Sequence, residues 1–173
     1  MKGERNAQVY QVGPHLFGTS STIPHWKTEE LIPSLKPFLL SLDTYKEKEL
    51  KIAFSLAIQP ESETQEEDHA KYRSLIEFEW ESATCRISVI PDTDSYLITI
   101  LAPNDPKEYT AYFFYGFTKG ILFLHATEAD AFVLNNILMM IYAFNTACSD
   151  TVLMHASVIK KDGKGYLFQG KSG

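Results

Sequence analysis

The residues best suited to chemistry stand at the end of the chain, where residues 166–173 read YLFQGKSG. A phosphate-binding loop needs a buried strand and then G-x-x-x-x-G-K-[ST] at the start of a helix. Its glycines let backbone amides wrap a phosphate, its lysine reaches the β- and γ-phosphates, and its hydroxyl holds magnesium. Here YLF supplies the strand and Gly170 the first glycine, but the motif glycine, lysine and hydroxyl would fall beyond Gly173. The spacing alone therefore also fits a flexible terminal segment.

The residues before this loop carry a resemblance to a kinase family. His155, Ala156 and Ser157 stand on a predicted strand, and a glycine hairpin at Gly163 and Gly165 leads into YLFQGKSG. This order closely resembles the P-loop approach in the HPr kinase/phosphorylase and phosphoenolpyruvate-carboxykinase-like kinase superfamily. There an H-A-S or H-G-S strand precedes G-x-G-x-L-[FL]-x-G-x-S-G-x-G-K-[ST]. The helical stretch 128–148 also resembles the helix before that strand in HPr-kinase-related proteins of unassigned substrate.

The resemblance implies an ATP-dependent phosphotransferase that uses ATP and Mg²⁺ as cofactors in the full-length protein. By position, Gly170, Ser172 and Gly173 match the loop residues that wrap the nucleotide phosphates. His155 and Ser157 match the strand pair beside the active site and are the catalytic candidates. The other interpretation of His155 is a strand histidine whose ring hydrogen-bonds a backbone carbonyl. The phosphoryl acceptor, an unknown protein or small molecule, is left open.

Lys171 is not the motif lysine, because it occupies a variable loop position in the resembling family. The family's phosphate-binding lysine, its magnesium-binding hydroxyl and its later acidic residues have no counterpart in this chain. We therefore expect the chain by itself to be inactive and to bind no cofactor. The alternative function is a non-catalytic substrate-recognition or assembly module that self-associates as a homo-oligomer. A small-ligand pocket between the sheet and the helix of residues 128–148 is a third possibility.

Composition and charge exclude several other classes. The chain has 173 residues, 45% hydrophobic and 22% charged, which is typical of a globular protein with one sizeable core. A formal net charge of −6 argues against a nucleic-acid partner. The two cysteines, Cys85 and Cys148, lie in no ligand spacing. The apolar run 131–144 is shorter than the roughly 20 residues of a membrane span. With no signal peptide at the start, we expect a cytoplasmic protein without membrane contact.

Metal and hydrolase chemistry have little support in the sequence. The five histidines show no metal-ligand spacing, and G-x-S-x-G is absent. His125, at the end of a predicted strand, is interpreted as structural. The acidic run ESETQEEDHAKY, residues 61–72, could hold a metal or contact a basic partner. We favour a solvated connection between the two strands of a hairpin.

The elements that must position these residues follow from hydrophobic periodicity. We expect a strand at 7–12, a loop at 13–24, and a short helix that starts at Thr28. Alternating apolar residues then predict a meander of closely spaced strands from residue 50 to residue 125. One long helix follows at residues 128–148, with an apolar face that includes Phe132, Ile137 and Phe144. Strands are expected at 151–160 and 165–169, joined by the turn at 162–163.

These elements predict an α+β fold: an antiparallel β-meander sheet packed with one long helix. The resemblance adds that the first strands of a phosphoenolpyruvate-carboxykinase-like nucleotide-binding fold follow. We expect a β-rich N-terminal domain at residues 1–127. Residues 128–173 would supply the helix and the strands that lead into an incomplete P-loop. The two parts could also form one compact unit.

Overall fold

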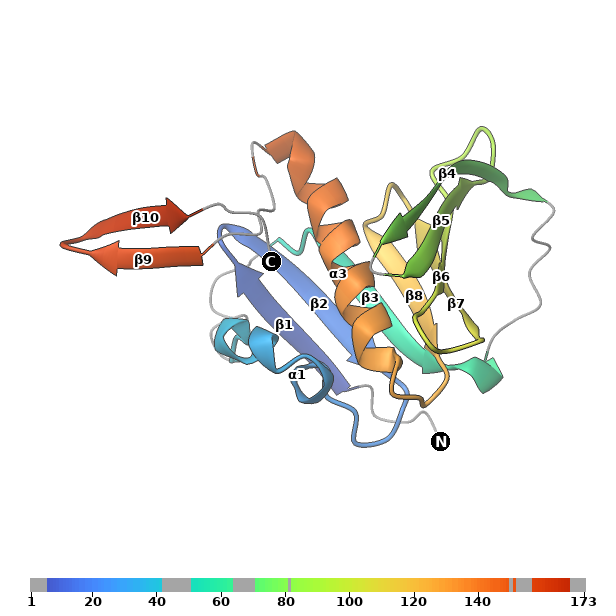
Figure 1. Ribbon diagram of the computed structural model, residues 1–173, viewed down its shortest axis with the longest axis horizontal. Helices are drawn as coiled ribbons and strands as arrows, with labels where there is room; N and C mark the ends of the chain where they lie inside the picture. The colour runs from blue at the N-terminus through green and yellow to red at the C-terminus, as the bar shows by residue number, and fades with distance from the viewer. Residues whose placement is uncertain are drawn as a thin grey trace.

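The computed structural model describes residues 6–41, 51–63, 71–80, 82–149, 151 and 157–168. They form one eight-stranded sheet, a long helix across it, and a separate two-stranded hairpin (Figure 1). The sheet contains β1 (Asn6–Val12), β2 (His15–Ser21), β3 (Phe54–Pro60), β4 (Arg73–Trp80), β5 (Ala83–Val89), β6 (Tyr96–Leu101), β7 (Glu108–Phe114) and β8 (Lys119–Leu124). The helices are α1 (Thr28–Leu31) and α3 (Asp130–Thr146), with 3₁₀ turns η1 (Pro33–Phe38), η2 (Glu61–Glu63) and η4 (Ala147–Ser149).

The α+β class is confirmed, but the prediction of a purely antiparallel sheet is wrong. The strand order is β1-β2-β3-β8-β7-β6-β5-β4, and β3 runs parallel to both of its neighbours, β2 and β8. A parallel pair needs a crossover of about a dozen residues or more. The stretch between β2 and β3, which contains α1 and η1, supplies it. The expected hairpin between β3 and β4 is also wrong, because β4 lies at the far edge of the sheet.

The predicted loop at residues 13–24 is largely strand β2. Gly13 and Pro14 form a two-residue turn between the paired residues Val12 and His15. Gly13 has φ +58°, a conformation that glycine adopts without a Cβ clash. The strand persists despite its glycine and serines because Phe17, 3% exposed, is part of the core. The helix predicted to start at Thr28 does begin there, as the short helix α1.

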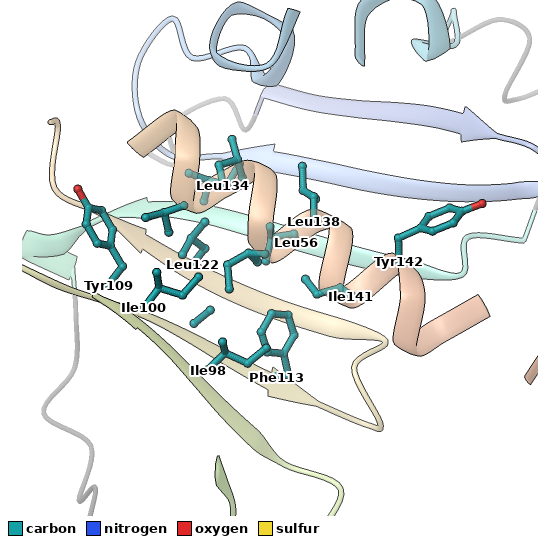
Figure 2. Close-up of a cluster of buried hydrophobic side chains, with 14 of the residues drawn as sticks. Leu56, Ile98, Ile100, Tyr109, Phe113, Leu122, Leu134, Leu138, Ile141 and Tyr142 are labelled. Carbon is teal, nitrogen blue, oxygen red and sulfur yellow. The ribbon is translucent and has the colours of Figure 1, made fainter. Parts of the chain in front are cut away.

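The core lies between the sheet and α3 (Figure 2). Leu56, Ile98 and Leu122 of the sheet face Leu134 and Ile141 of the helix, and all five are buried. Burial of this kind contributes roughly 1.5–3 kcal/mol for each large side chain. The predicted helix is confirmed with slightly narrower bounds, since α3 spans Asp130–Thr146 and continues as η4. Its buried stripe also includes Asp130, Val133, Asn136, Ile137, Leu138 and Tyr142.

Two residues of the predicted apolar helix face are not fully buried: Phe144 is 41% exposed, and Phe132 is partly buried. Gly120 on β8 is a glycine for a steric reason, because the ring of Phe113 on β7 lies against its backbone. A Cβ on Gly120 would lie 2.3 Å from Cε1 of Phe113, so the ring occupies the space that any side chain would need. Phe113 is thereby held against the central strands, and Ala or a larger residue at position 120 would displace its ring.

By length and composition, Asp130–Ser149 could cross a membrane. The core helix of a globular fold passes the same criterion, and here Val133, Ile137 and Ile141 are buried against the sheet. The helix thus has a structural use for its apolar residues inside the fold.

Candidate functional site

The described part of the predicted phosphate site is a β-hairpin. β9 (Ser157–Lys161) pairs antiparallel with β10 (Lys164–Phe168), and the turn between them has φ +51° at Asp162 and +75° at Gly163. In this register the backbone of Ser157 lies opposite Phe168. Figure 1 shows the hairpin extending away from the eight-stranded sheet, to the left of β1 and β2 in this view.

The other predicted site residues, His155, Gly170, Ser172 and Gly173, lie outside the described residues. Of the two catalytic candidates, Ser157 alone is therefore placed, and only by its backbone. The turn predicted at residues 162–163 is confirmed. The strands predicted at 151–160 and 165–169 are confirmed in part, as Ser157–Lys161 and Lys164–Phe168; Thr151 is not in a strand, and residues 152–156 lie outside the described ones. Within the hairpin, the backbone of Ser157 therefore lies beside the end of β10, the strand that precedes the glycine-rich segment in the sequence.

Contacts at the C-terminal end of α3 position the chain before this hairpin. His15 Nε2 lies 2.8 Å from the Thr151 hydroxyl, and the His15 ring packs edge-on against Tyr142 with centroids 5.8 Å apart. Tyr142 in turn donates a hydrogen bond of 3.0 Å to the Val12 carbonyl. Burial raises the pKa of Tyr142, so its hydroxyl stays protonated and able to donate. The β1–β2 turn thus anchors Thr151, which lies four residues before His155.

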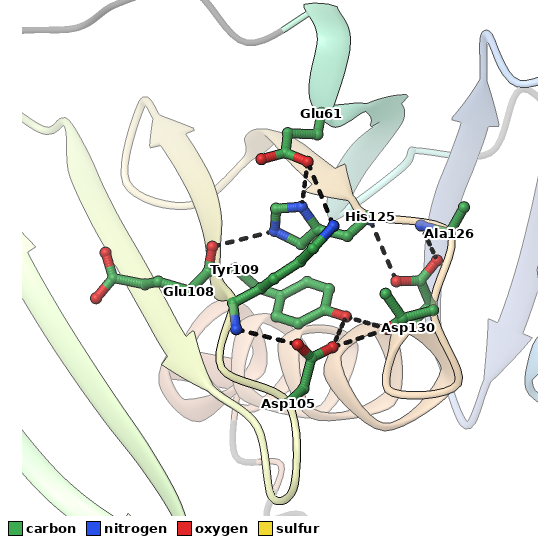
Figure 3. A network of polar contacts seen from close by, with 9 residues as sticks. Glu61, Asp105, Glu108, Tyr109, His125, Ala126 and Asp130 are labelled. Atoms are coloured by element: carbon green, nitrogen blue, oxygen red, sulfur yellow. Dashed lines mark hydrogen bonds and ion pairs between the residues drawn. The ribbon is translucent and has the colours of Figure 1, made fainter.

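A second polar cluster lies at the opposite end of α3 (Figure 3). His125, just after β8, has its Nδ1 atom 2.7 Å from Glu61 and its Nε2 atom 3.1 Å from the Glu108 carbonyl. The His125 side chain is 7% exposed, whereas Glu61 is mostly exposed. The hydrogen bond with His125 lowers the pKa of Glu61, and Lys107, 3.8 Å away, acts in the same direction. These contacts join the end of β3 to the β6–β7 and β8–α3 loops.

Asp105 is the centre of the same cluster. Its Oδ2 atom accepts hydrogen bonds of 2.9 Å from both Tyr109 and Thr127, and its Oδ1 atom accepts one of 3.0 Å from the Lys107 amide. The Lys107 amide is the main cause of the lowered pKa of Asp105. Burial raises the pKa of Tyr109 well above its ordinary value. Asp130 accepts hydrogen bonds from the amides of residues 125 and 126 and closes the β8–α3 turn.

This cluster connects three loops, and few of its polar groups remain available to bind a ligand. Its members are Glu61, Asp105, Tyr109, His125, Thr127 and Asp130. The Asp105 carboxylate already accepts from three donors, and the carboxylate of Asp130 caps a turn. An open pocket of about 530 Å³ adjoins it, lined by Pro103, Asn104, Glu128 and Phe132 among others. Within the described residues, no group of three or more His, Cys, Asp or Glu could hold a metal ion.

A smaller pocket lies where the sequence suggested one, between the sheet and α3. It has about 190 Å³ and an apolar lining that includes Phe17, Leu35, Leu138 and Met139. Its polar lining atoms are few, and Tyr142 already donates its proton to Val12. The pocket therefore offers shape and apolar surface, and no group that selects a ligand.

Sequence reasoning interpreted His125 as structural, and its contacts agree with that role. It missed the cluster that surrounds this histidine. A signal was present in the turn Asn104-Asp105-Pro106, because an aspartate in such a turn commonly accepts from the amide two residues on. Glu61 could not be paired with His125 from the sequence, since the two residues meet only through the parallel pairing of β3 with β8.

Comparison with known proteins adds no relative to this picture. No protein-family model, curated protein or solved structure matches the chain significantly.

Proposed function

We propose that this chain is the N-terminal portion of an ATP-dependent P-loop kinase related to HPr kinase. The observation that supports the proposal is the order of elements at the end of the chain. β10 ends at Phe168, two residues before Gly170, and pairs with a strand that begins at Ser157. A strand followed in sequence by a glycine-rich segment is part of the context that a phosphate-binding loop requires. A glycine-rich tail that no strand precedes would lack this context.

The residues present fit part of a nucleotide site. Gly170, Ser172 and Gly173 would turn backbone amides toward the phosphates, and His155 and Ser157 would stand beside the acceptor. ATP would supply the phosphoryl group, and Mg²⁺ would neutralise its charge. The chain carries neither the motif lysine nor the hydroxyl that holds the metal. The part of the site in this chain is therefore the phosphate-wrapping entry to the loop.

The coding sequence beyond Gly173 is the first test. We expect the next four codons to encode x-G-K-[ST], and a stop codon there would refute the kinase in favour of the non-catalytic module. The extended chain should then bind Mg-ATP, measured as a rise in melting temperature. Substituting the motif lysine by alanine should abolish that rise. Lys171→Ala is the matched control, and it should retain the rise because Lys171 occupies a variable position.

The chain as it stands gives the complementary test. Because it lacks the groups that hold the β- and γ-phosphates, millimolar Mg-ATP should leave its melting temperature unchanged. A clear increase, lost on Gly170→Val or Gly173→Val, would contradict this expectation. Gly116→Ala is the control for substituting a glycine: its positive φ of +63° means that alanine lowers the stability of the chain, but any increase caused by Mg-ATP should persist in it.

A further inference from the structure

A polar pocket lies on the face of the sheet opposite α3. Its volume is about 260 Å³, and strands β4, β5, β6 and β7 each contribute to its lining. On β6, Ile98 and Ile100 are in the core beneath the helix. The alternate residues Leu97 and Thr99 therefore face the other side of the sheet, where both line the pocket. The other lining residues are Tyr72, Ser74, Arg86, Ser88 and Glu108.

Strand pairing places the polar lining groups next to one another. Ser74 lies opposite Ser88, Ser88 lies opposite Leu97, and Arg86 lies opposite Thr99. Residues directly opposite share a face of the sheet, with Cβ atoms about 4.5–5.5 Å apart. Three hydroxyl groups and one guanidinium group are therefore within reach of a single small ligand.

Two of these hydroxyl groups are buried and lack a protein partner in the part of the chain that the structure describes. Ser88 is 5% exposed and Thr99 is 6% exposed, and no described residue forms a hydrogen bond with either side chain. Burial of a hydroxyl without a hydrogen bond is unfavourable, and buried polar groups normally have a partner. Because both residues line the pocket, a molecule in the pocket can supply the missing hydrogen bonds.

The charged groups at the pocket are largely compensated. Arg86 Nε already donates to a Glu77 carboxylate oxygen at 2.7 Å. This hydrogen bond raises the pKa of Arg86, and the charge of Glu108 acts in the same direction. Figure 3 shows the Glu108 side chain pointing away from the His125 cluster, which Glu108 joins through its backbone carbonyl. Lys71, next to the pocket, has its Nζ atom 5.5 Å from the centre of the Tyr72 ring.

Two basic and two acidic side chains thus flank the pocket. Glu79 lies two residues beyond Glu77 on the same face, and Arg73 lies opposite Val89, whose alternation with Ile87 places it on the helix side. A carboxylate bound at Arg86 would lie beside glutamates, and a cation bound at Glu108 would lie beside the guanidinium group. This balance of charge favours an uncharged ligand.

The donors and acceptors match a ring that carries hydroxyl groups. Arg86 only donates, the Glu108 carboxylate only accepts, and each of the three lining hydroxyls does both, as the hydroxyls of a sugar do. Tyr72 and Leu97 offer apolar surface to the C–H groups of such a ring. The volume is slightly below the roughly 300–1,000 Å³ of pockets that hold drug-sized ligands, which suits one ring better than a chain of rings.

We propose that this pocket binds a single uncharged sugar ring. Ser88 and Thr99 hydrogen-bond two of its hydroxyl groups, and Arg86 and Glu108 hold others from the sides of the pocket. The interaction with Glu77 keeps the guanidinium group of Arg86 in place while its remaining N–H groups donate to the sugar. The site uses no residue of the hairpin or of the glycine-rich segment, so it is independent of the proposed kinase function.

The experiment is a titration of the whole chain, labelled with ¹⁵N, in which the shifts of the backbone amides are recorded. The probes are D-glucose, D-galactose, D-mannose and D-xylose. At least one of them should give saturable shifts at residues 86–88 and 97–99. The dissociation constant should be on the order of 1 mM, as expected for a ligand of about a dozen non-hydrogen atoms. Acetate, ethylammonium and glycine, which carry charge, should bind more weakly.

Thr99→Val and Ser88→Ala test the two buried hydroxyl groups. Each should weaken binding of the sugar by about three- to tenfold, because each removes one hydrogen bond. Thr84→Val is the matched control: Thr84 lies on the same face of β5, two residues before Arg86, and does not line the pocket. Its affinity for the sugar should be unchanged. The amide spectrum of each variant shows whether it is folded.

The absence of saturable shifts at these residues with all four sugars would overturn the proposal. Tighter binding of acetate, ethylammonium or glycine at the same residues would also overturn it, because the pocket would then select a charged ligand. So would an unchanged affinity of Thr99→Val and Ser88→Ala, both folded, since the buried hydroxyl groups would then have no part in binding.

Discussion

The two edge strands of the sheet have similar sequences and opposite surroundings. β1 reads NAQVYQV and β4 reads RSLIEFEW, and both alternate apolar with polar residues. At the β1 edge, the Leu40 amide donates to the Val9 carbonyl at 2.8 Å and Tyr10 forms a bridge with Leu39, so the chain after η1 covers the strand. At the β4 edge, Ile76 and its neighbours remain exposed.

Polar contacts complete the cover at β1. Glu29 on α1 accepts hydrogen bonds from Gln8 and from the Tyr10 hydroxyl, the latter of 3.0 Å, and Gln8 accepts from the Thr28 amide at 2.9 Å. Tyr10 is fully buried as a result. At β4, Glu77 forms an exposed ion pair with Arg86 on the neighbouring strand β5. The comparison teaches that tertiary cover, more than strand pattern, decides whether an edge is closed or available.

The largest expected effect is at the closed edge. Tyr10 stacks on Phe17 with ring centroids 5.1 Å apart. Tyr10→Ala would leave a cavity, and we expect it to lower the free energy of unfolding by about 3–5 kcal/mol, measured by urea denaturation. Tyr10→Phe, which keeps the ring and removes the hydroxyl with its hydrogen bond to Glu29, should cost about 1 kcal/mol. If Tyr10→Ala lowered the free energy of unfolding by no more than Tyr10→Phe does, this edge would not be part of the cooperative core.

The next effect is the pH dependence that Glu29 confers. Burial acts to raise the pKa of Glu29, but hydrogen bonds from its own amide, Gln8 and Tyr10 outweigh it and hold the pKa below its ordinary value. A carboxyl with a lowered folded-state pKa contributes stability above its unfolded pKa, and loses it as the pH falls through the folded value. Glu29→Gln should therefore be less stable than the wild type by about 1 kcal/mol at neutral pH. The two should converge in acid.

Unfolding curves of Glu29→Gln and the wild type across this range test the sign. Tyr10→Phe, which removes one of the donors to the carboxylate, should show a weaker acid dependence than the wild type. A difference between Glu29→Gln and the wild type that grows as the pH falls would contradict the assigned direction.

The sequence predicts where the strands of this sheet lie along the chain better than it predicts which strands are adjacent in space. The alternation in FSLAIQP and the apolar length of α3 are local properties, and both predictions are confirmed. Strand β2 was missed because its glycine and serines favour a loop locally, while burial of Phe17 decides the outcome. The parallel pairing of β3 depends on a crossover through α1 and η1, which no local pattern encodes.

The same limit applies to the site and to β4. Alternation correctly places Phe78 and Trp80 on one face, but it cannot reveal that Ile76 lies beyond the cover of α3. The cluster at His125 brings together three loops that are far apart in sequence. The phosphate-loop approach could be proposed from the sequence because its residues are contiguous. Its hairpin is confirmed, whereas His155 and the glycine-rich segment lie outside the described residues.

At the open edge, the Glu77–Arg86 pair should contribute little. Its atoms lie 2.7 Å apart, but both side chains are about half exposed. A double-mutant cycle with Glu77→Gln and Arg86→Gln should give a coupling energy close to zero, as is usual for exposed ion pairs. High salt should not raise that value, because exposed charges are screened. A salt-insensitive coupling of several kcal/mol would mean that the β4 edge is covered in solution, and would remove the contrast with β1.

A similarly small effect is expected for Ile76→Thr. Threonine keeps the β-branched shape that strands favour, and an exposed position has little apolar burial to lose. The free energy of unfolding should change by no more than about 0.5 kcal/mol, as for most surface substitutions. Ile98→Thr is the matched control: Ile98 is fully buried on β6, so the same substitution there leaves a hydroxyl in the core and should cost several times more. Equal costs at the two positions would show that Ile76 is buried in solution, and the open edge would then be closed by a part of the protein or by another copy.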